Sequence, residues 1–192
     1  MKIEIKNRWD NKVLVSGKYE NIKDCLEKNR DANLRYSDLR YSNLRYSDLS
    51  YSDLRYSNLR YSDLCGSNLC GSDLRGSDLR YSNLRYSNLC GSNLCDSDLG
   101  GSDLRYSNLR YSDLSGIKNY SEHHTIFQEV VRQQKIDTFT QKEWSIIGQI
   151  IVHRLCWGSI RKRFNKSAMG IFKKLSKVGF EEWEEKYDST IN

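Results

Sequence analysis

The sequence predicts a mainly β solenoid, in which a short repeat winds into stacked coils between an N-terminal cap and a C-terminal helical segment. The composition alone is close to that of a disordered protein, since the 192-residue chain has a mean hydropathy of −0.76 and no proline. Two regularities overturn that interpretation. Leucine recurs at every fifth position from Leu34 to Leu114, in seventeen copies, and the apolar residues beyond Gly116 follow a helical spacing.

The repeat unit reads Ser-[Asp/Asn]-Leu-x-x, with Ala32 in place of serine in the first copy. A helix would spread leucines five residues apart around its axis, and a straight strand would place successive leucines on opposite faces. Both conflicts disappear if each unit is a short extended stretch followed by a corner. Four corners then close a coil of twenty residues, and residues 32–116 make just over four coils that stack by parallel pairing. This arrangement predicts one inward column containing Leu34, Leu54, Leu74, Leu94 and Leu114.

These units resemble those of the pentapeptide repeat family, whose pattern is Ala-[Asp/Asn]-Leu-x-x. The resemblance implies a right-handed quadrilateral parallel β-helix over residues 32–116. Serine replaces alanine at the small inward position in sixteen of the seventeen units. Because a buried hydroxyl without a partner costs free energy, we expect these serines to bond to nearby backbone groups.

The corners of the coils pose a conformational question. The last position of a unit is glycine in six copies and tyrosine in most others. A type II turn requires positive φ at its third residue, which glycine tolerates and tyrosine does not. The sequence therefore predicts type I-like or irregular turns at the tyrosines.

Residues 1–31 predict a cap on the first coil. Residues 2–6 alternate polar and apolar side chains, residues 9–12 form a turn, and residues 13–15 are apolar, which is typical of a β-hairpin. Residues 21–26 then predict a short helix that closes the coil.

Residues 117–192 predict a C-terminal helical segment. Ser121 is a candidate N-cap for its first helix, and a capping box beginning at Thr140 opens a second. Ser167 is a candidate start of a third helix, and residues 180–187 predict a final helix or turn. The predicted apolar face of the second helix consists of Trp144, Ile147, Ile151 and Leu155.

The sequence contains no catalytic, nucleotide-binding or metal-binding motif, so it predicts no enzyme, no cofactor and no metal. The histidines and the last cysteine lack the paired spacing of zinc ligands: His123, His124, His153 and Cys156. Cys70 and Cys90, twenty residues apart, are predicted to stack on one face as free thiols, with a disulfide between them as the alternative. The start of the chain has no secretory pattern and no apolar run spans a membrane, which predicts a cytoplasmic protein.

The outward positions predict either self-supporting side-chain ladders on a solvated wall or a surface for a partner. They are candidates for the latter because tyrosine and arginine are enriched at binding hot spots. An aspartate or asparagine two residues before each arginine offsets the repulsion between stacked like charges. The C-terminal segment adds a run of basic residues. The candidate interaction residues are Arg40, Tyr41, Arg60, Tyr61, Arg80 and Tyr81 in the repeat and Arg161, Lys162, Arg163, Lys166, Lys173, Lys174 and Lys177 after it.

The distribution of charge along the chain ranks the possible functions. Residues 32–116 contain ten arginines and ten aspartates, and residues 117–192 carry a net charge of +4. We expect a non-enzymatic scaffold with an unidentified protein partner, and the alternative is nucleic-acid binding through the basic helices. The family resemblance implies a third possibility, a DNA mimic that binds DNA gyrase, but that role needs a strongly acidic surface. The C-terminal segment is also predicted to form a homodimer in which basic residues 154–177 meet acidic residues 181–185.

Overall fold

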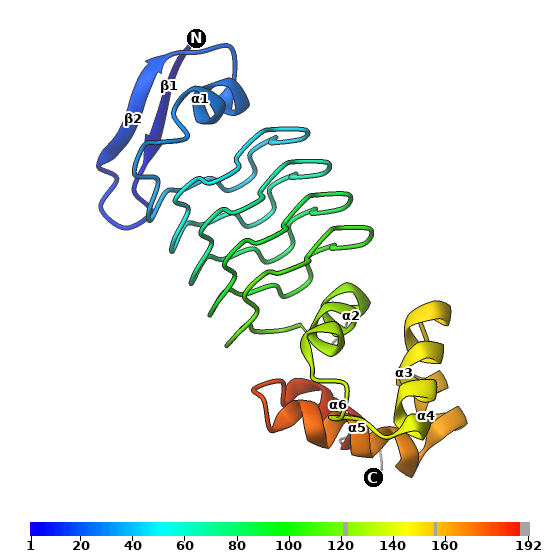
Figure 1. Cartoon of the computed structure of the whole chain (residues 1–192). Coiled ribbons are helices and arrows are strands. Elements are labelled where there is room, and N and C mark those ends of the chain that lie inside the picture. The colour runs from blue at the N-terminus through cyan, green and yellow to red at the C-terminus, as the bar shows by residue number, and fades with distance from the viewer. Residues whose placement is uncertain (121–122, 156, 189–192) are drawn as a thin grey trace. The chain divides into compact units, whose positions relative to one another are not determined.

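The computed structural model describes residues 1–120, 123–155 and 157–188. They form two compact units, Met1–Thr125 and Ile126–Asn192. The first unit contains a terminal hairpin, one helix and a stack of coils, and the second contains helices (Figure 1). Among the described residues, no helix combines the length and the apolar character needed to cross a membrane.

The predicted hairpin and first helix are confirmed. Strand β1 (Lys2–Lys6) pairs antiparallel with β2 (Val13–Lys18), and helix α1 (Ile22–Lys28) follows. The side chain of Asn21 caps α1 by accepting a hydrogen bond from the Asp24 backbone. Because the amide of Asp38 donates to the Lys6 carbonyl at 2.8 Å, the hairpin is joined directly to the first coil.

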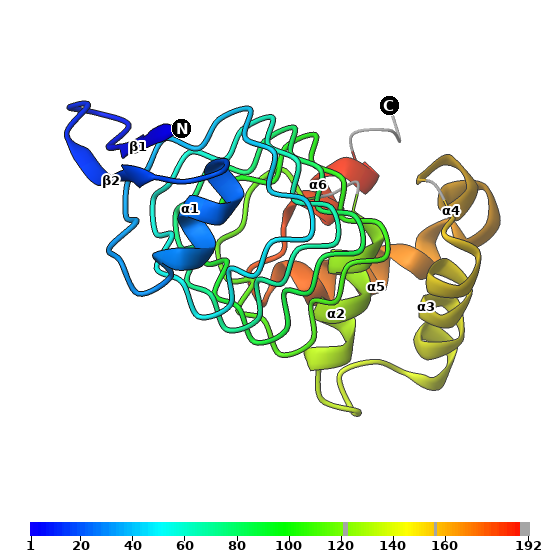
Figure 2. The same cartoon turned by 90° about the horizontal axis from the view of Figure 1, so that it is seen from above.

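The coils pair with one another at a spacing of twenty residues, as the leucine period predicts. Parallel bridges join Asn33 to Asp53, Asp53 to Asp73 and so on through the stack, and successive coils overlie one another in Figure 2. Every repeat leucine is at most 3% exposed. Each unit contributes an isolated bridge rather than a strand, so β1 and β2 are the only extended strands among the described residues. The prediction of a mainly β chain therefore holds only in part, because the β pairing is limited to the hairpin and to isolated inter-coil bridges.

The inward serines largely behave as predicted. Eleven of the sixteen hydroxyls donate to the carbonyl of the leucine three residues earlier, as Ser62 does to Leu59 at 2.7 Å. Five buried hydroxyls have no partner among the described residues: Ser37, Ser57, Ser67, Ser77 and Ser97.

The prediction for the tyrosine corners is wrong. All ten corner tyrosines have positive φ, from 55° at Tyr46 to 64° at Tyr106, close to the 62–68° of the corner glycines. The amide of Ser62 donates to the Leu59 carbonyl across such a corner, which is the bond of a β-turn, and the sign of φ is that of type II. The amide of Tyr61 donates to the Arg80 carbonyl of the next coil, and the other corner amides from Tyr36 to Asp96 make the equivalent bond, so inter-coil bonding favours the shared backbone conformation over this part of the stack.

The second unit consists of helices packed around aromatic side chains. Phe127 meets Trp183 edge-on with ring centroids 5.2 Å apart, and Phe172 lies 5.0 Å from Tyr187. These four rings are at most 3% exposed, which makes them the core of this unit. The helices of the C-terminal segment are α2 (His124–Gln133), α3 (Gln141–His153), α4 (Trp157–Phe164), α5 (Lys166–Ser176) and α6 (Glu182–Asp188).

In the helical unit, the sequence predicts where the helices begin more accurately than which side chains they bury. The capping box at Thr140 is confirmed, and α5 begins one residue before the predicted Ser167. The predicted apolar face of α3 is correct only in part: Ile147 is buried, Trp144 and Ile151 are half-buried, and Leu155 lies beyond the helix because Arg154 ends it with φ of 46°. The residues that α3 buries are Ile146, Ile147 and Ile150. Helix α4 was not predicted, and the candidate N-cap Ser121 lies outside the described residues.

Candidate interaction surface

Stacking of the coils brings the six candidate residues of the repeat onto one outward face. We call this the Arg–Tyr face and define it as residues 36–41, 56–61, 76–81 and 96–101 of successive coils. Parallel bridges align the second residue after each corner down this face: Asp38, Asn58, Asp78, Asp98 and Lys118. The arginines and tyrosines that follow these residues therefore form two neighbouring columns.

The tyrosine column of the Arg–Tyr face is a stack of parallel rings. The ring centroids of Tyr41 and Tyr61 are 5.2 Å apart at an interplanar angle of 2°, and those of Tyr61 and Tyr81 are 5.0 Å apart at 6°. The column ends at Gly101, where an added Cβ would come within 2.6 Å of the Tyr81 ring. The three tyrosines remain 72%, 44% and 55% exposed, so they form an ordered aromatic strip open to solvent.

The arginine column is neutralised by aspartates on the same face. Arg40 donates two hydrogen bonds to Asp38, at 2.8 and 2.7 Å, and this bonding lowers the pKa of the Asp38 carboxyl. Arg80 likewise forms two bonds to Asp78 and lies 3.5 Å from Asp98. Arg60 is 3.9 Å from Asp78. Arg40 and Arg80 are therefore held in ion pairs and Arg60 lies near a carboxylate, which leaves little free positive charge for a polyanion.

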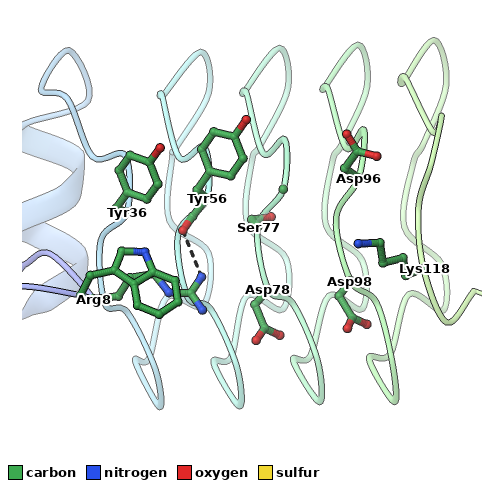
Figure 3. A pocket seen from close by; sticks show the side chains of 10 residues that line it. Arg8, Tyr36, Tyr56, Ser77, Asp78, Asp96, Asp98 and Lys118 are labelled. Carbon is green, nitrogen blue, oxygen red and sulfur yellow. Dashed lines mark hydrogen bonds between the residues drawn. The ribbon is translucent and has the colours of Figure 1, made fainter.

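A groove of about 270 Å³ runs along the edge of the Arg–Tyr face (Figure 3). The hairpin supplies one end of the groove, where Trp9 is 74% exposed and Arg8 donates to the Tyr56 carbonyl at 3.0 Å. The fifth coil supplies Lys118 at the other end. The lining residues are Arg8, Trp9, Tyr36, Tyr56, Gly76, Ser77, Asp78, Asp96, Asp98 and Lys118.

Two departures from the repeat occur beside this groove. Asp96 occupies a corner with φ of 59°, where every other unit has tyrosine or glycine. Gly100 stands where the three preceding coils of the face have arginine, so Asp98 lacks an arginine two residues later. Asp98 instead accepts from the Asn119 side chain at 2.7 Å. The unusual corner at Asp96 is visible in the sequence, but the contribution of Trp9 depends on how the hairpin packs.

The basic candidates after the repeat lie in the helical unit. Two of them are engaged internally: Lys174 pairs with Glu143 at 2.7 Å, and Arg161 lies over the Tyr187 ring at 5.8 Å. The Glu143 carboxyl is desolvated by burial, yet its bonds to Lys174 and Thr140 hold its pKa below the usual range. The other five are exposed and have no acidic partner among the described residues: Lys162, Arg163, Lys166, Lys173 and Lys177.

The described residues offer no alternative chemical centre. No group of three histidine, cysteine or carboxylate side chains in the described part of the chain is placed to hold a metal ion. Cys70 and Cys90 are both free thiols of intermediate exposure on the coil surface. Cys156 lies outside the described residues.

Comparison with known proteins identifies the repeat. The pattern described as pentapeptide repeats matches in eight copies, over residues 30–64, 57–94 and 82–118. Residues 30–118 are pentapeptide repeats. No curated protein matches the chain.

The pentapeptide repeat region also resembles solved structures. A pentapeptide repeat protein of the cyanobacterium Cyanothece 51142, Rfr23, is 30% identical over 44% of this chain and 56% of that one, with a TM-score of 0.41. One from Nostoc PCC 7120 is 33% identical over 40% and 63%, with a TM-score of 0.39. QnrB1, a plasmid-mediated fluoroquinolone resistance protein, is 15% identical over 44% and 54%, with a TM-score of 0.27. The matches span between about half and two thirds of the length of these structures.

Proposed function

We propose that this protein is a non-enzymatic cytoplasmic scaffold whose right-handed quadrilateral β-helix presents the Arg–Tyr face to a protein partner. The observation that carries the proposal is the exposed stack of Tyr41, Tyr61 and Tyr81. Aromatic side chains held in place by their neighbours lose little freedom on binding, so contact with them yields more net affinity than contact with flexible side chains. Tyrosine is also among the residues most enriched at binding hot spots.

The charges of the Arg–Tyr face favour a protein partner over a polyanion. Each arginine of this face lies near an aspartate, so approach of a phosphate backbone would meet carboxylates beside the guanidinium groups. A protein surface can instead lay apolar groups on the tyrosine strip and polar groups on the ion pairs, which is the usual arrangement of interface centre and rim.

The test removes the three tyrosine rings of the strip while keeping the backbone conformation of the corners that carry them. Asparagine tolerates positive φ, so a Tyr41→Asn, Tyr61→Asn, Tyr81→Asn variant removes the rings at little backbone cost. The matched control makes the same change at three exposed tyrosines of other corner columns: Tyr46, Tyr51 and Tyr111. A partner captured by the full chain should bind the strip variant at least about tenfold more weakly, as expected for loss of a hot spot, and the control within about threefold. Equal binding by both variants would refute the proposal.

A homodimer through the C-terminal segment is a second proposal. Its support is exposed apolar surface in the helical unit, where Ile136 is 87%, Val152 is 74% and Val178 is 51% exposed. Pairing of basic residues 154–177 with acidic residues 181–185 of a second copy would add charge complementarity. Light scattering of the full chain decides this, because a mass that stays monomeric at high concentration contradicts it.

Nucleic-acid binding remains the alternative function, supported by five exposed basic residues that have no acidic partner within the described part of the chain: Lys162, Arg163, Lys166, Lys173 and Lys177. Its test is a mobility shift with duplex DNA and RNA over a range of salt, because phosphate contacts make affinity fall steeply as salt rises. A DNA-gyrase supercoiling assay tests the DNA-mimic alternative, which the balance of ten arginines and ten aspartates in residues 32–116 disfavours.

A further inference from the structure

A hollow of about 460 Å³ lies on helix α5 of the helical unit. Four of its lining residues are Lys166, Met169, Gly170 and Lys173, at relative positions 0, 3, 4 and 7, so they form one stripe along the helix. The remaining lining residues are Asn165 and Tyr187. The hollow is therefore a longitudinal groove on α5, independent of the Arg–Tyr face.

The middle of this α5 hollow is apolar and fixed in shape. Gly170 leaves its floor without a side chain, and an added Cβ there would lie 2.9 Å from a Glu143 oxygen. The Tyr187 hydroxyl donates to the Asn165 carbonyl at 2.6 Å, which holds the tyrosine in the wall. Met169 supplies a polarisable thioether that adapts to an apolar neighbour. An apolar side chain of a ligand would thus enter a formed site.

The two ends of the α5 hollow are positively charged. Lys166 and Lys173 are exposed and about 10 Å apart along the helix, from a rise of about 1.5 Å per residue. The nearby carboxylate of Glu143 is already bonded to Lys174 at 2.7 Å, and no carboxylate lines the hollow among the described residues. A complementary ligand carries a negative charge at each end and an apolar group between them.

We infer that the α5 hollow binds an acidic amphipathic helix of a partner protein, with leucine-like side chains over Gly170 and a carboxylate on each of Lys166 and Lys173. A partner helix has the same rise per residue as α5, so glutamates seven residues apart match the lysines, and residues three and four after the first lie over the hollow.

This helix fits the α5 hollow better than a nucleic acid does. Single-stranded nucleic acids stack their bases on exposed aromatic faces, whereas Tyr187 is only 1% exposed. Phosphates would satisfy the two lysines but leave the apolar floor between them without a matching group.

The test titrates the full chain into a fluorescein-labelled, alanine-based helical peptide with two glutamates seven residues apart and two leucines between them. Peptides with glutamine for glutamate, or alanine for leucine, serve as ligand controls. The Lys166→Glu, Lys173→Glu variant should weaken binding by at least about tenfold, because it replaces two attractions by two repulsions. The matched control, Lys162→Glu with Lys177→Glu, makes the same change of charge outside the hollow and should stay within about threefold.

Three outcomes overturn the inference. Equal weakening by both double variants would mean that only the overall charge attracts the peptide. If the alanine-for-leucine peptide bound as tightly as the peptide with leucines, the hollow would not contribute to binding. If an oligonucleotide bound more strongly than the peptide, and the Lys166→Glu, Lys173→Glu variant lost that binding, the two lysines would be contacts for phosphate. Circular dichroism of each variant confirms that it is folded.

Discussion

Replacing the central ring of the tyrosine strip should destabilise the coil stack more than replacing an unstacked tyrosine. Tyr61 contacts two rings, at 5.2 and 5.0 Å, and Arg60 lies 5.3 Å from its centroid. Tyr51 has nearly the same φ, 60° against 57°, but its ring lies over Gly71 and has no stacked partner among the residues that the structure describes. The change to glycine relieves similar backbone strain at both positions, so the difference between the two variants isolates the ring contacts.

The magnitude of this difference follows from the contacts that Tyr61 makes. Each aromatic pair contributes about 1 kcal/mol beyond area burial, and an exposed cation–π contact about 0.5 kcal/mol. Relief of left-handed strain gains about 1 kcal/mol, and the added freedom of glycine in the unfolded chain costs about as much. Tyr61→Gly should therefore lower the free energy of unfolding by about 2 to 3 kcal/mol, and Tyr51→Gly by less than about 1 kcal/mol.

Urea unfolding followed by far-ultraviolet circular dichroism measures both values. With a slope of about 2 kcal/mol per molar urea, the Tyr61→Gly midpoint should fall by about 1 M, while Tyr61→Phe, which keeps the ring, should stay close to the parent. Equal losses for Tyr61→Gly and Tyr51→Gly would refute the reasoning, because the stacked rings would then contribute nothing.

Three further predictions concern hydroxyls, carboxylates and a helix cap. Ser57→Ala should raise the free energy of unfolding by about 1 kcal/mol, because it removes a buried hydroxyl without a partner, whereas Ser62→Ala should lower it by a similar amount in the same urea assay. Bonding to arginine lowers the pKa values of Asp38 and Asp103, so the stabilisation from these groups is present above about pH 4 and is lost as pH falls through the folded-state values. Thermal melts should be constant from about pH 7 to 5 and fall below about pH 4, and an Asp38→Asn, Asp103→Asn variant should show a shallower fall. Thr140→Ala should destabilise the helical unit by about 1 kcal/mol through loss of the capping box, as a calorimetric melt would detect, while no change would show that the cap is dispensable.

The parts of the fold predicted correctly depend on short-range periodicity. A leucine at every fifth position leaves few ways to bury all copies, which is why the column through Leu34 follows from the sequence. The hairpin follows from the alternation of polar and apolar residues at positions 2–6 and the turn residues after them. The tyrosine corners could not be predicted from the residues one at a time. Positive φ at Tyr61 is disfavoured locally by about 1–2 kcal/mol, but its amide bonds to Arg80 and its ring stacks on residues twenty positions away.

The candidate interaction surface, like the fold, could be predicted from the sequence only in part. Tyr41, Tyr61 and Tyr81 align because of the twenty-residue coil, so their column follows from the repeat. The groove beside them does not, because Trp9 reaches it through packing of the hairpin. In the helical unit, the spacing of apolar residues alone did not reveal that Arg154 ends α3, and the predicted face extended beyond the helix.

Bridging across twenty residues also constrains how the length of this protein can change. Gain or loss of one five-residue unit between Tyr61 and Tyr81 would move every later residue to the neighbouring face, separating Tyr81 from the ring of Tyr61 and interrupting both columns. A tandem duplication of the coil that contains Arg60 and Tyr61 preserves every alignment and adds one more arginine and one more tyrosine to the same wall. The length of the Arg–Tyr face can therefore evolve in steps of about 4.8 Å without redesign of the existing surface, so that genes differing by sixty bases would encode graded lengths of one aromatic strip.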